Sequence, residues 1–352
     1  MDINPYLKLM VEKEASDIYF TVGAAVRIKV AGKVISVGKT ILSAEMTEAI
    51  AQTIMNQTQW TIFGKQHETD FAITIPETNA RFRVNVFKQQ ELVSIVMRYI
   101  RTQVPKLDDL NSPPVLKDLT LRKRGLILMV GATNSGKSTT LAAMINHRNE
   151  HQAGHILTIE DPIEFVHPHK KSLINQRELG VDTHSYLRAL KSSMRESPDV
   201  ILIGEIRDQE TMGAALELSN TGHLALSTLH ANNAYQAMQR VVNMFTFEQH
   251  KQLFMDLSLN LIAVISQRLV VGVSGKRVAA VEIMINTPYI SELILKGQID
   301  EIKEVMSSGG AEKIQTFDMA LLELYQKGII TLEEALANAD SRTNLQAKIT
   351  FG

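Results

Sequence analysis

A ten-residue stretch, Gly131–Thr140, has the composition and spacing of a phosphate-binding loop. It reads G-A-T-N-S-G-K-S-T-T, in which two glycines separated by four residues precede a lysine and a serine. Glycines let backbone N–H groups approach phosphate oxygens, and a lysine neutralises the outer phosphates. The stretch therefore predicts a site for a nucleoside triphosphate. The residues expected to contact it are Gly131, Ala132, Thr133, Asn134, Ser135, Gly136, Lys137, Ser138 and Thr139.

The segments on either side of this loop have the character that such a site requires. G-L-I-L-M-V (Gly125–Val130) is an apolar run of strand length, and the residues after the loop are rich in helix formers. A helix that begins at the loop directs the positive end of its dipole at a phosphate. Asn134 stands where a third glycine is common, and asparagine tolerates left-handed backbone well. We therefore expect strand, loop and helix, with the Ser138 hydroxyl as a Mg²⁺ ligand.

Three more polar side chains follow strand-like segments. Glu160 follows H-I-L-T-I, Glu205 follows V-I-L-I-G, and His230 follows L-A-L-S-T-L. In a parallel α/β sheet, ligands bind beyond the carboxyl ends of the strands, so we expect these groups at one edge with the loop. Phosphoryl transfer to water needs one carboxylate for the water and another for the Mg²⁺ shell. We assign Glu160 to the water, Glu205 to Mg²⁺ and His230 to the γ-phosphate, although the two carboxylate roles could be exchanged.

A second histidine, His223, lies seven residues before His230 in the same segment. Along an extended strand this spacing corresponds to ~23 Å, at ~3.3 Å per residue. Both histidines are therefore not expected at one phosphate. His223 is left with two alternatives, a place at a subunit boundary or an ordinary structural role.

From Gly125 onward, strand patterns alternate with helix patterns, which favours a parallel sheet. The predicted strands are 126–130, 155–159, 200–203, 224–228 and Val278–Ile285. The predicted helices are 137–150, 183–195, 208–220, 233–244, a long one over Glu248–Gln267, and two near the end over Thr316–Lys327 and Thr331–Ala339. Thr331 and Glu334 have the spacing of a capping box at the start of the last helix.

The first hundred residues have the pattern of a smaller α+β unit. Helices are predicted over 3–15 and Ser43–Gln57, the latter capped by Ser43, and strands over Asp17–Thr21, Val26–Val30, Val34–Val37, Asp70–Ile75, Ala80–Phe87 and Leu92–Ile100. Alternation in R-F-R-V-N-V-F places Arg81 and Arg83 on one face, and Arg98 lies near the end of the next strand. These arginines either are solvated or face a phosphate site, and the alternation is compatible with both alternatives.

Composition limits the class of protein and its compartment. The chain has 352 residues, 45% of them hydrophobic and 21% charged, which suits a globular protein of two domains. The net charge of −1 provides no bulk positive field for nucleic acid, and no apolar run reaches the ~18–20 residues of a membrane-spanning helix. The N-terminus lacks the layout of a secretory signal, and there are no cysteines, which fits a reducing compartment. Prolines in 102–121 indicate a linker between domains 1–101 and 122–352.

With these residues in place, the chain resembles the secretion and type IV pilus ATPase superfamily, and specifically the PilT/PilU retraction ATPases. The segments that carry the resemblance are Gly131–Thr140, T-I-E-D-P-I-E-F (Thr158–Phe165), S-P-D-V-I-L-I-G-E-I-R-D (Ser197–Asp208), T-G-H-L-A-L-S-T-L-H-A-N-N-A (Thr221–Ala234) and I-Q-T-F-D-M-A-L (Ile314–Leu321). The resemblance implies a RecA-like P-loop NTPase core with a parallel-rich sheet, preceded by a small PAS-like α+β N-terminal domain.

The resemblance also implies a function and partners. It implies a cytoplasmic, Mg²⁺-dependent ATPase that forms a homohexameric ring, peripheral at the inner membrane and without direct membrane insertion. ATP hydrolysis would act on an inner-membrane platform protein and withdraw pilin subunits, which supports twitching motility and DNA uptake. Arginines of the N-terminal domain complete the site in this family, which extends a catalytic role to Arg83 and Arg98 and more weakly to Arg81.

One segment departs from the PilT pattern. PilT-type ATPases carry a basic A-I-R-N-L-I-R-E stretch where this chain has P-Y-I-S-E-L-I-L-K-G (Pro288–Gly297), without those arginines. We therefore expect the accessory, PilU kind, working beside a PilT-type ATPase. An ATP-binding coupling subunit with little activity of its own is one alternative. A pilus-extension or type II secretion ATPase is another, although such proteins usually carry a four-cysteine zinc module that this chain cannot form.

Overall fold

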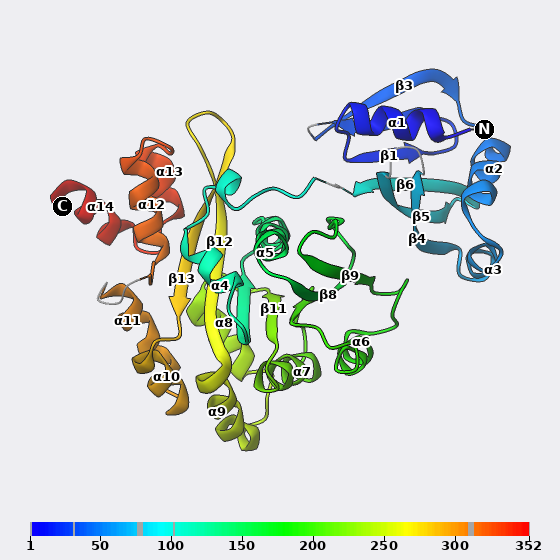
Figure 1. Cartoon of the computed structure of the whole chain (residues 1–352). Coiled ribbons are helices and arrows are strands. Elements are labelled where there is room, and N and C mark those ends of the chain that lie inside the picture. The colour runs from blue at the N-terminus through cyan, green and yellow to red at the C-terminus, as the bar shows by residue number, and fades with distance from the viewer. Residues whose placement is uncertain (1, 31, 76–79, 101–102, 309–312, 352) are drawn as a thin grey trace. The chain divides into compact units, whose positions relative to one another are not determined.

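The computed structural model describes residues 2–30, 32–75, 80–100, 103–308 and 313–351, which form two compact units. The first unit comprises Met1–Gln103 with Glu164–Val166, and the second comprises Val104–Ile163 and His167–Gly352. Figure 1 shows the elements of both units. The predicted domain boundary between residues 101 and 102 lies outside the described residues.

The first unit is built on a six-stranded antiparallel sheet in the order β3-β2-β1-β6-β5-β4. Apolar side chains of the sheet and helices, Phe20 and Phe82 among them, form its core. Its elements are α1 (Asn4–Glu12), β1 (Asp17–Phe20), β2 (Ala25–Val30), β3 (Lys33–Ile41), α2 (Ala44–Ile54), α3 (Gln57–Gln66), β4 (Glu68–Ile75), β5 (Ala80–Gln89) and β6 (Leu92–Ile100).

The segment predicted as one helix over Ser43–Gln57 is two helices, α2 and α3. Ser43 caps α2 as expected, because its hydroxyl accepts a hydrogen bond from the Met46 amide. The chain then breaks at Asn56, whose side chain accepts from the Gln59 amide while the Gln59 side chain accepts from the Asn56 amide, both at 2.9 Å. This reciprocal capping box begins α3, and asparagine is a strong N-cap residue.

The second unit is built on a seven-stranded sheet in the order β13-β12-β7-β11-β10-β8-β9, parallel except for the antiparallel pair β12–β13. The strands are β7 (Gly125–Val130), β8 (Gly154–Glu160), β9 (Ser172–Glu178), β10 (Val200–Ile203), β11 (Leu224–Leu229), β12 (Leu261–Val271) and β13 (Arg277–Ile285). The longer helices are α4 (Val115–Thr120), α5 (Lys137–His151), α6 (Tyr186–Ser193), α7 (Gln209–Asn220), α8 (Ala234–Val242), α9 (His250–Asn260), α10 (Pro288–Leu295), α11 (Ile302–Ser307), α12 (Phe317–Gln326), α13 (Leu332–Asn338) and α14 (Arg342–Phe351).

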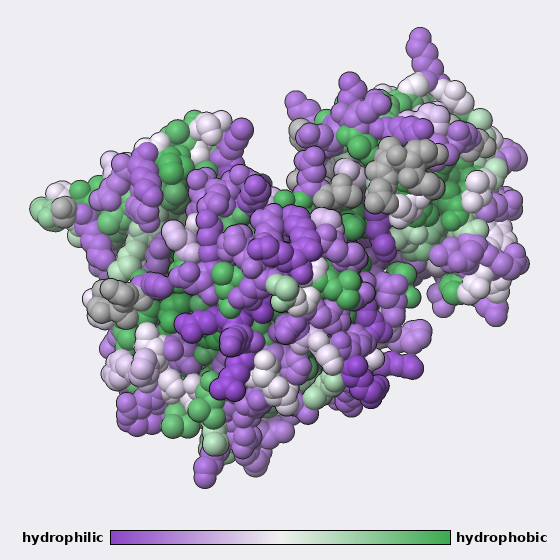
Figure 2. All heavy atoms as spheres, viewed as in Figure 1, coloured by the Kyte–Doolittle hydropathy of each residue, from purple (hydrophilic) through white to green (hydrophobic). Residues whose placement is uncertain are grey.

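Helices cover both faces of this sheet, which explains why its strands read as continuous apolar runs. On β7, Leu126 and Leu128 join a core shared with α6 to α10. Ile127 and Met129, which alternate with them, join a second core shared with α4 and α5. Figure 2 shows hydrophilic residues over much of the visible outer surface. Within the described residues, no helix has both the length and the apolar character needed to cross a membrane.

The long helix predicted over Glu248–Gln267 is wrong. Helix α9 ends at Asn260, and strand β12 begins at Leu261 between β7 and β13. The apolar run L-I-A-V-I after Asn260 is buried on both sides, and such a run has no period that distinguishes a strand from a buried helix. Position in the sheet, rather than periodicity, decides the conformation here.

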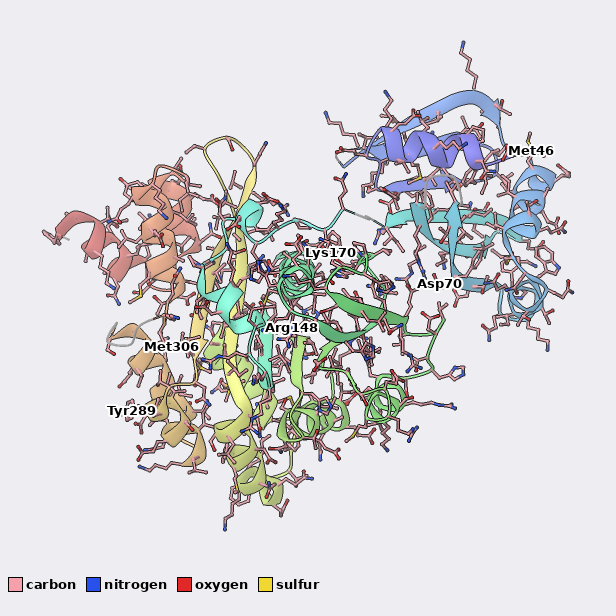
Figure 3. All side chains as sticks on the ribbon, viewed as in Figure 1. Met46, Asp70, Arg148, Lys170, Tyr289 and Met306 are labelled. Atoms are coloured by element: carbon pink, nitrogen blue, oxygen red, sulfur yellow. The ribbon has the colours of Figure 1, made fainter. Side chains whose placement is uncertain are left out.

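The predicted linker also differs from the structure. Residues 107–121 contain a short 3₁₀ helix and α4, and Leu107, Leu116 and Leu119 are buried in a core of the second unit. Arg148, labelled in Figure 3, fixes this segment by donating from α5 to the carbonyls of Thr120 and Arg122 at 2.8 and 2.7 Å. Prolines break regular structure here without preventing the segment from packing.

The capping box predicted at Thr331 forms only in part. The Thr331 hydroxyl accepts from the Glu334 amide at 3.2 Å, as a cap should. The Glu334 carboxylate, however, accepts from the Val271 amide at the end of β12, at 2.8 Å. Helix α13 is therefore tied to the sheet by the residue expected to complete its cap.

Candidate nucleotide-binding and hydrolysis site

The loop between β7 and α5 has the backbone conformation that its sequence predicts. Gly136, directly before α5, has φ +87°, and Asn134 has φ +63°, the left-handed conformation expected for asparagine at this position. Lys137 is the first residue of α5, so that the positive end of the helix dipole points into the loop. The strand, loop and helix of a phosphate-binding site are therefore in place.

The donors of this loop fit a phosphate. The Lys137 ammonium, on a side chain that is largely buried, donates to the carbonyls of Gly131 and Ala132, both at 2.8 Å. The Ser135 hydroxyl is buried and has no hydrogen-bond partner in the part of the chain that the structure describes. A cation, a buried hydroxyl and the backbone amides of the loop are the groups that bind phosphate oxygens in P-loop proteins.

The structure brings His230 and Glu205 together beside this loop. Leu229 pairs with Val130 in the sheet, so that His230 and Gly131 leave neighbouring strands side by side. His230 Nε2 lies 3.2 Å from Glu205 Oε1. His230 and the first three loop residues, Gly131 to Thr133, also line one open hollow of about 540 Å³. The expected convergence at one sheet edge is thus observed for the loop, the carboxylate and the imidazole.

Glu205 has a further partner, which the sequence did not predict. Its Oε2 accepts from Nε and Nη2 of Arg207, each at 2.7 Å. The hydrogen bond to this carboxylate raises the pKa of the Arg207 guanidinium above its ordinary value. The Glu205 side chain is 16% exposed. The exposed Arg207 compensates its charge at one oxygen, and the other oxygen faces His230.

Glu160 is held at the same edge by neutral donors. Its Oε1 accepts from the Thr158 hydroxyl at 2.6 Å and from the Gln176 amide at 3.1 Å. Gln176 is in turn anchored, because its side-chain oxygen accepts from the His167 amide at 2.8 Å. Thr158 lies two residues earlier on β8 and Gln176 on β9, so that two strands orient this carboxylate.

A glycine lets the two carboxylate-bearing segments approach each other. Ile203 pairs with Ile159, and the next residues are Gly204 and Glu160. A Cβ added to Gly204 would lie 3.2 Å from Glu160 Cα and 2.7 Å from the Tyr186 hydroxyl, so that a larger residue would displace its neighbours. Glu160 and Glu205 therefore belong to adjacent segments, although their carboxylates have different partners. This geometry leaves the division of their roles open.

His223 lies at the opposite edge of the sheet. It precedes β11, and its carbonyl accepts from the Gly125 amide at the start of β7. Its Nδ1 lies 3.1 Å from the Leu218 carbonyl and 3.1 Å from the Thr221 hydroxyl. The separation of the two histidines agrees with the strand spacing, and His223 satisfies local groups at the end of α7.

The arginines of the first unit lie on its sheet as the alternation predicts. Arg83 on β5 is directly opposite Arg98 on β6, and Arg81 shares the face of β5 that carries Arg83. Arg98 Nε donates to Asp17 Oδ1 at 2.8 Å, and Arg83 Nε lies 3.8 Å from Asp70 Oδ1. Their contact with nucleotide stays a prediction.

Comparison with known proteins agrees with these motifs. A sequence model of the family described as type II/IV secretion system protein matches residues 1–336. The chain is 48% identical to the type IV pilus ATPase PilU of Pseudomonas aeruginosa, over 100% of this chain and 92% of that protein. It is 42% identical to the type IV pilus retraction ATPase PilT of the same organism, over 96% of this chain and 98% of that protein.

The chain belongs to the PilT/PilU family of type IV pilus ATPases. A crystal structure of the pilus retraction motor PilT with bound ADP matches this fold with a TM-score of 0.91 at 37% identity, covering 98% of this chain and 99% of that one. The predicted α/β fold with a RecA-like core and an N-terminal α+β domain is confirmed. As a member of this family, the chain is a nucleotide-binding ATPase.

Proposed function

We propose that this chain is the accessory, PilU-type ATPase of type IV pilus retraction. The observation that carries the proposal is the meeting of the P-loop, Glu205 and His230 at one sheet edge, in a chain 48% identical to a PilU along its whole length. In this role it is a homohexamer, cytoplasmic and peripheral at the inner membrane. It works with a PilT-type ATPase on the inner-membrane platform protein of the pilus, and it supports twitching motility and DNA uptake.

The residues of the site divide the work of ATP hydrolysis. The loop amides and Lys137 hold the phosphates, and Ser138 with Glu205 would hold Mg²⁺. When bound, Mg²⁺ neutralises charge on the phosphate oxygens. Glu160, oriented by Thr158 and Gln176, positions the attacking water, because its carboxylate can accept a hydrogen bond from that water without turning.

Groups with positive or donor character complete the site. His230 donates a hydrogen bond to the γ-phosphate, which Glu205 supports by orienting its imidazole. Arg83 and Arg98 of the N-terminal domain supply positive charge where negative charge develops on the transferred phosphoryl group. Both lie near carboxylates on their own sheet, Arg83 at 3.8 Å from Asp70 and Arg98 at 2.8 Å from Asp17, and the hydrogen bond to Asp17 orients the Arg98 side chain.

The accessory role is supported by helix α10. Its sequence P-Y-I-S-E-L-I-L carries no arginine and one acidic residue, Glu292, which pairs with Lys296. Ile290, Leu293 and Ile294 are buried, whereas Tyr289, labelled in Figure 3, is exposed. The basic surface that the resemblance leads us to expect in a PilT-type motor is thus replaced by a neutral one.

The proposal is tested by measuring ATP hydrolysis and pilus pulling force with this protein alone and then beside a PilT-type ATPase. Hydrolysis by the purified protein, together with a gain in force only when both proteins are present, is the expected result. Force generated by this protein alone would exclude the accessory role. Binding of ATP without multiple-turnover hydrolysis would instead indicate a coupling subunit, and loss of pili on deletion of the protein would indicate an extension ATPase.

A further inference from the structure

The buried side-chain amide of Gln267, on β12, forms a hydrogen bond with the P-loop. Its Nε2 donates to the Ser135 carbonyl within the loop at 2.8 Å, and its Oε1 accepts from the Thr140 hydroxyl in the first turn of α5, also at 2.8 Å. Gln267 is 3% exposed. One side chain therefore joins the loop to the helix that follows it.

Gln267 also sets the space in which the loop glycines lie. A Cβ added to Gly131 would lie 2.5 Å from the Gln267 carbonyl oxygen, and one added to Gly136 would lie 2.7 Å from Gln267 Nε2. The loop backbone thus packs directly against Gln267 at both of its glycines.

The position of Gln267 is fixed by strand pairing in the sheet. Residue Ser266, directly before Gln267, pairs with Val130 on β7, the last residue before the loop. On its other side, Gln267 itself pairs with Val281 on β13. Because β12 is paired on both sides, the backbone of Gln267 is held in place and does not follow movements of the loop.

We propose that Gln267 is a positioning residue for nucleotide binding, which holds the P-loop in the conformation that accepts phosphate. An amide suits this role because it offers one donor and one acceptor in a fixed plane, as the Ser135 carbonyl and the Thr140 hydroxyl require. A loop that is already ordered loses less conformational entropy when it binds its ligand, so affinity rises. The Gln267 side chain contacts the loop and the helix that would hold the phosphates, so it acts on affinity more than on the rate of hydrolysis. The inference rests on nucleotide binding at the P-loop.

The test compares ADP affinity in three variants of the full chain. Gln267→Met keeps the volume and removes both hydrogen bonds, and Thr140→Val removes only the bond to Oε1. Gln152→Met is the matched control: its amide also donates to a carbonyl, that of Leu121 at 3.3 Å, but at the far end of α5, ~20 Å from the loop at ~1.5 Å per residue. Binding is measured by titration with fluorescent ADP in the presence of Mg²⁺, and melting temperature is measured without nucleotide.

We expect Gln267→Met to weaken ADP binding by roughly tenfold or more, with a rise in KM for ATP and a smaller change in kcat. Thr140→Val should weaken binding in the same direction by roughly threefold to tenfold, and it keeps the test valid if Gln267→Met does not fold. Gln152→Met should bind ADP as the wild type does. Wild-type ADP affinity in Gln267→Met would overturn this inference but not the nucleotide site. If Gln267→Met does not fold, wild-type ADP affinity in Thr140→Val would do the same.

Two further results separate this inference from the nucleotide site itself. Equal losses of melting temperature in the two methionine variants, with ADP affinity lowered only in Gln267→Met, would support positioning rather than general packing. A wild-type chain that bound no ADP would overturn the nucleotide site, and the inference with it. Lys137→Ala, which removes the ammonium of the loop, shows in the same titration what complete loss of the site looks like.

Discussion

The Lys137 ammonium lies inside the P-loop, where it donates to two loop carbonyls. Its removal leaves the backbone amides without a countercharge for the outer phosphates. We predict that Lys137→Ala lowers ADP and ATP affinity at least tenfold, measured by equilibrium titration. Unchanged affinity in a folded variant, checked by circular dichroism, would mean that the nucleotide binds elsewhere.

The two carboxylates at the sheet edge differ in their partners, and this difference makes their roles testable. Glu205 contacts His230 and Arg207, whereas Glu160 accepts from the neutral groups of Thr158 and Gln176. We predict that Glu205→Gln raises the Mg²⁺ concentration needed for half-maximal hydrolysis. Glu160→Gln should lower kcat by roughly 10²-fold or more without changing that concentration.

Hydrolysis rates measured across a range of Mg²⁺ concentrations distinguish the two assignments. If Glu160→Gln shifts the Mg²⁺ requirement and Glu205→Gln lowers only kcat, the roles are exchanged. Asp161→Asn, next to Glu160 on the same segment, serves as a control for loss of charge nearby.

The two histidines have different partners and therefore different expected effects. His230 contacts Glu205 beside the loop, and His223 contacts groups at the end of α7. We predict that His230→Ala lowers kcat by roughly tenfold or more, whereas His223→Ala changes it little, as measured by phosphate release. A larger loss at His223 would show that the residue acts from outside the site described here, at a subunit boundary.

At the scale of elements, strand β12 bears three successive polar residues, Ser266, Gln267 and Arg268, that reach different parts of the second unit. Gln267 holds the P-loop, and Ser266 donates to the buried carboxylate of Glu282 at 3.0 Å. Arg268 pairs with Asp340 at 2.6 Å and lies over the ring of Phe317. One strand thus connects the nucleotide loop with the C-terminal helices.

Glu282 gives the strand pair β12–β13 a pH dependence. Burial raises the pKa of its carboxyl to about 6, although the amide of Ala234 and the hydroxyl of Ser266 donate to it, while Asp340 and Arg268 act in opposite directions. Folding therefore favours the protonated form. Its contribution to stability is full below about pH 4.5 and is lost as the pH rises through 6, a change of about 2 kcal/mol.

We predict that Glu282→Gln, which is neutral at every pH, removes this dependence. The melting temperature of Glu282→Gln minus that of the wild type should be larger at pH 7.5 than at pH 5, by roughly 2–5 °C. Thermal unfolding followed by circular dichroism at both values measures this difference. Glu292→Gln, at an exposed ion pair on α10, is the control, and parallel pH curves for wild type and Glu282→Gln would contradict the prediction.

At the scale of the whole molecule, the proposed function requires side chains of one unit to act on a ligand held by the other. Arg98 is 70% exposed and is oriented by the buried Asp17, so it is available for a partner beyond its own sheet. We predict that Arg98→Ala leaves ADP affinity within about threefold of the wild type and lowers kcat by roughly 10²-fold or more. Arg27→Ala, another arginine of the same sheet, is the control. Wild-type turnover in Arg98→Ala would make it a solvated residue.

Much of the second unit could be predicted from the sequence, because its strands are short, apolar and followed by recognisable polar groups. The strands over β7, β10 and β11 end within one residue of their predicted bounds, and the P-loop conformation follows from its glycines and Asn134. β12 could not be predicted, because a run buried on both sides has the same pattern in a strand and in a helix. Glu334 and Leu116 show the same limit, because each contacts a distant partner that its local pattern did not identify.

The sequence by itself determined which residues could bind a triphosphate and on which side of the sheet they lie, because glycine spacing, strand length and the order of strand and helix are local properties. Only the tertiary structure decided what holds them there. Gln267 reaches Ser135 and Thr140 across 132 and 127 residues of chain, and Glu205 meets His230 only because their strands are neighbours in the sheet. Hydrogen bonds between segments so far apart depend on which strands pair, and strand pairing leaves no period in the sequence.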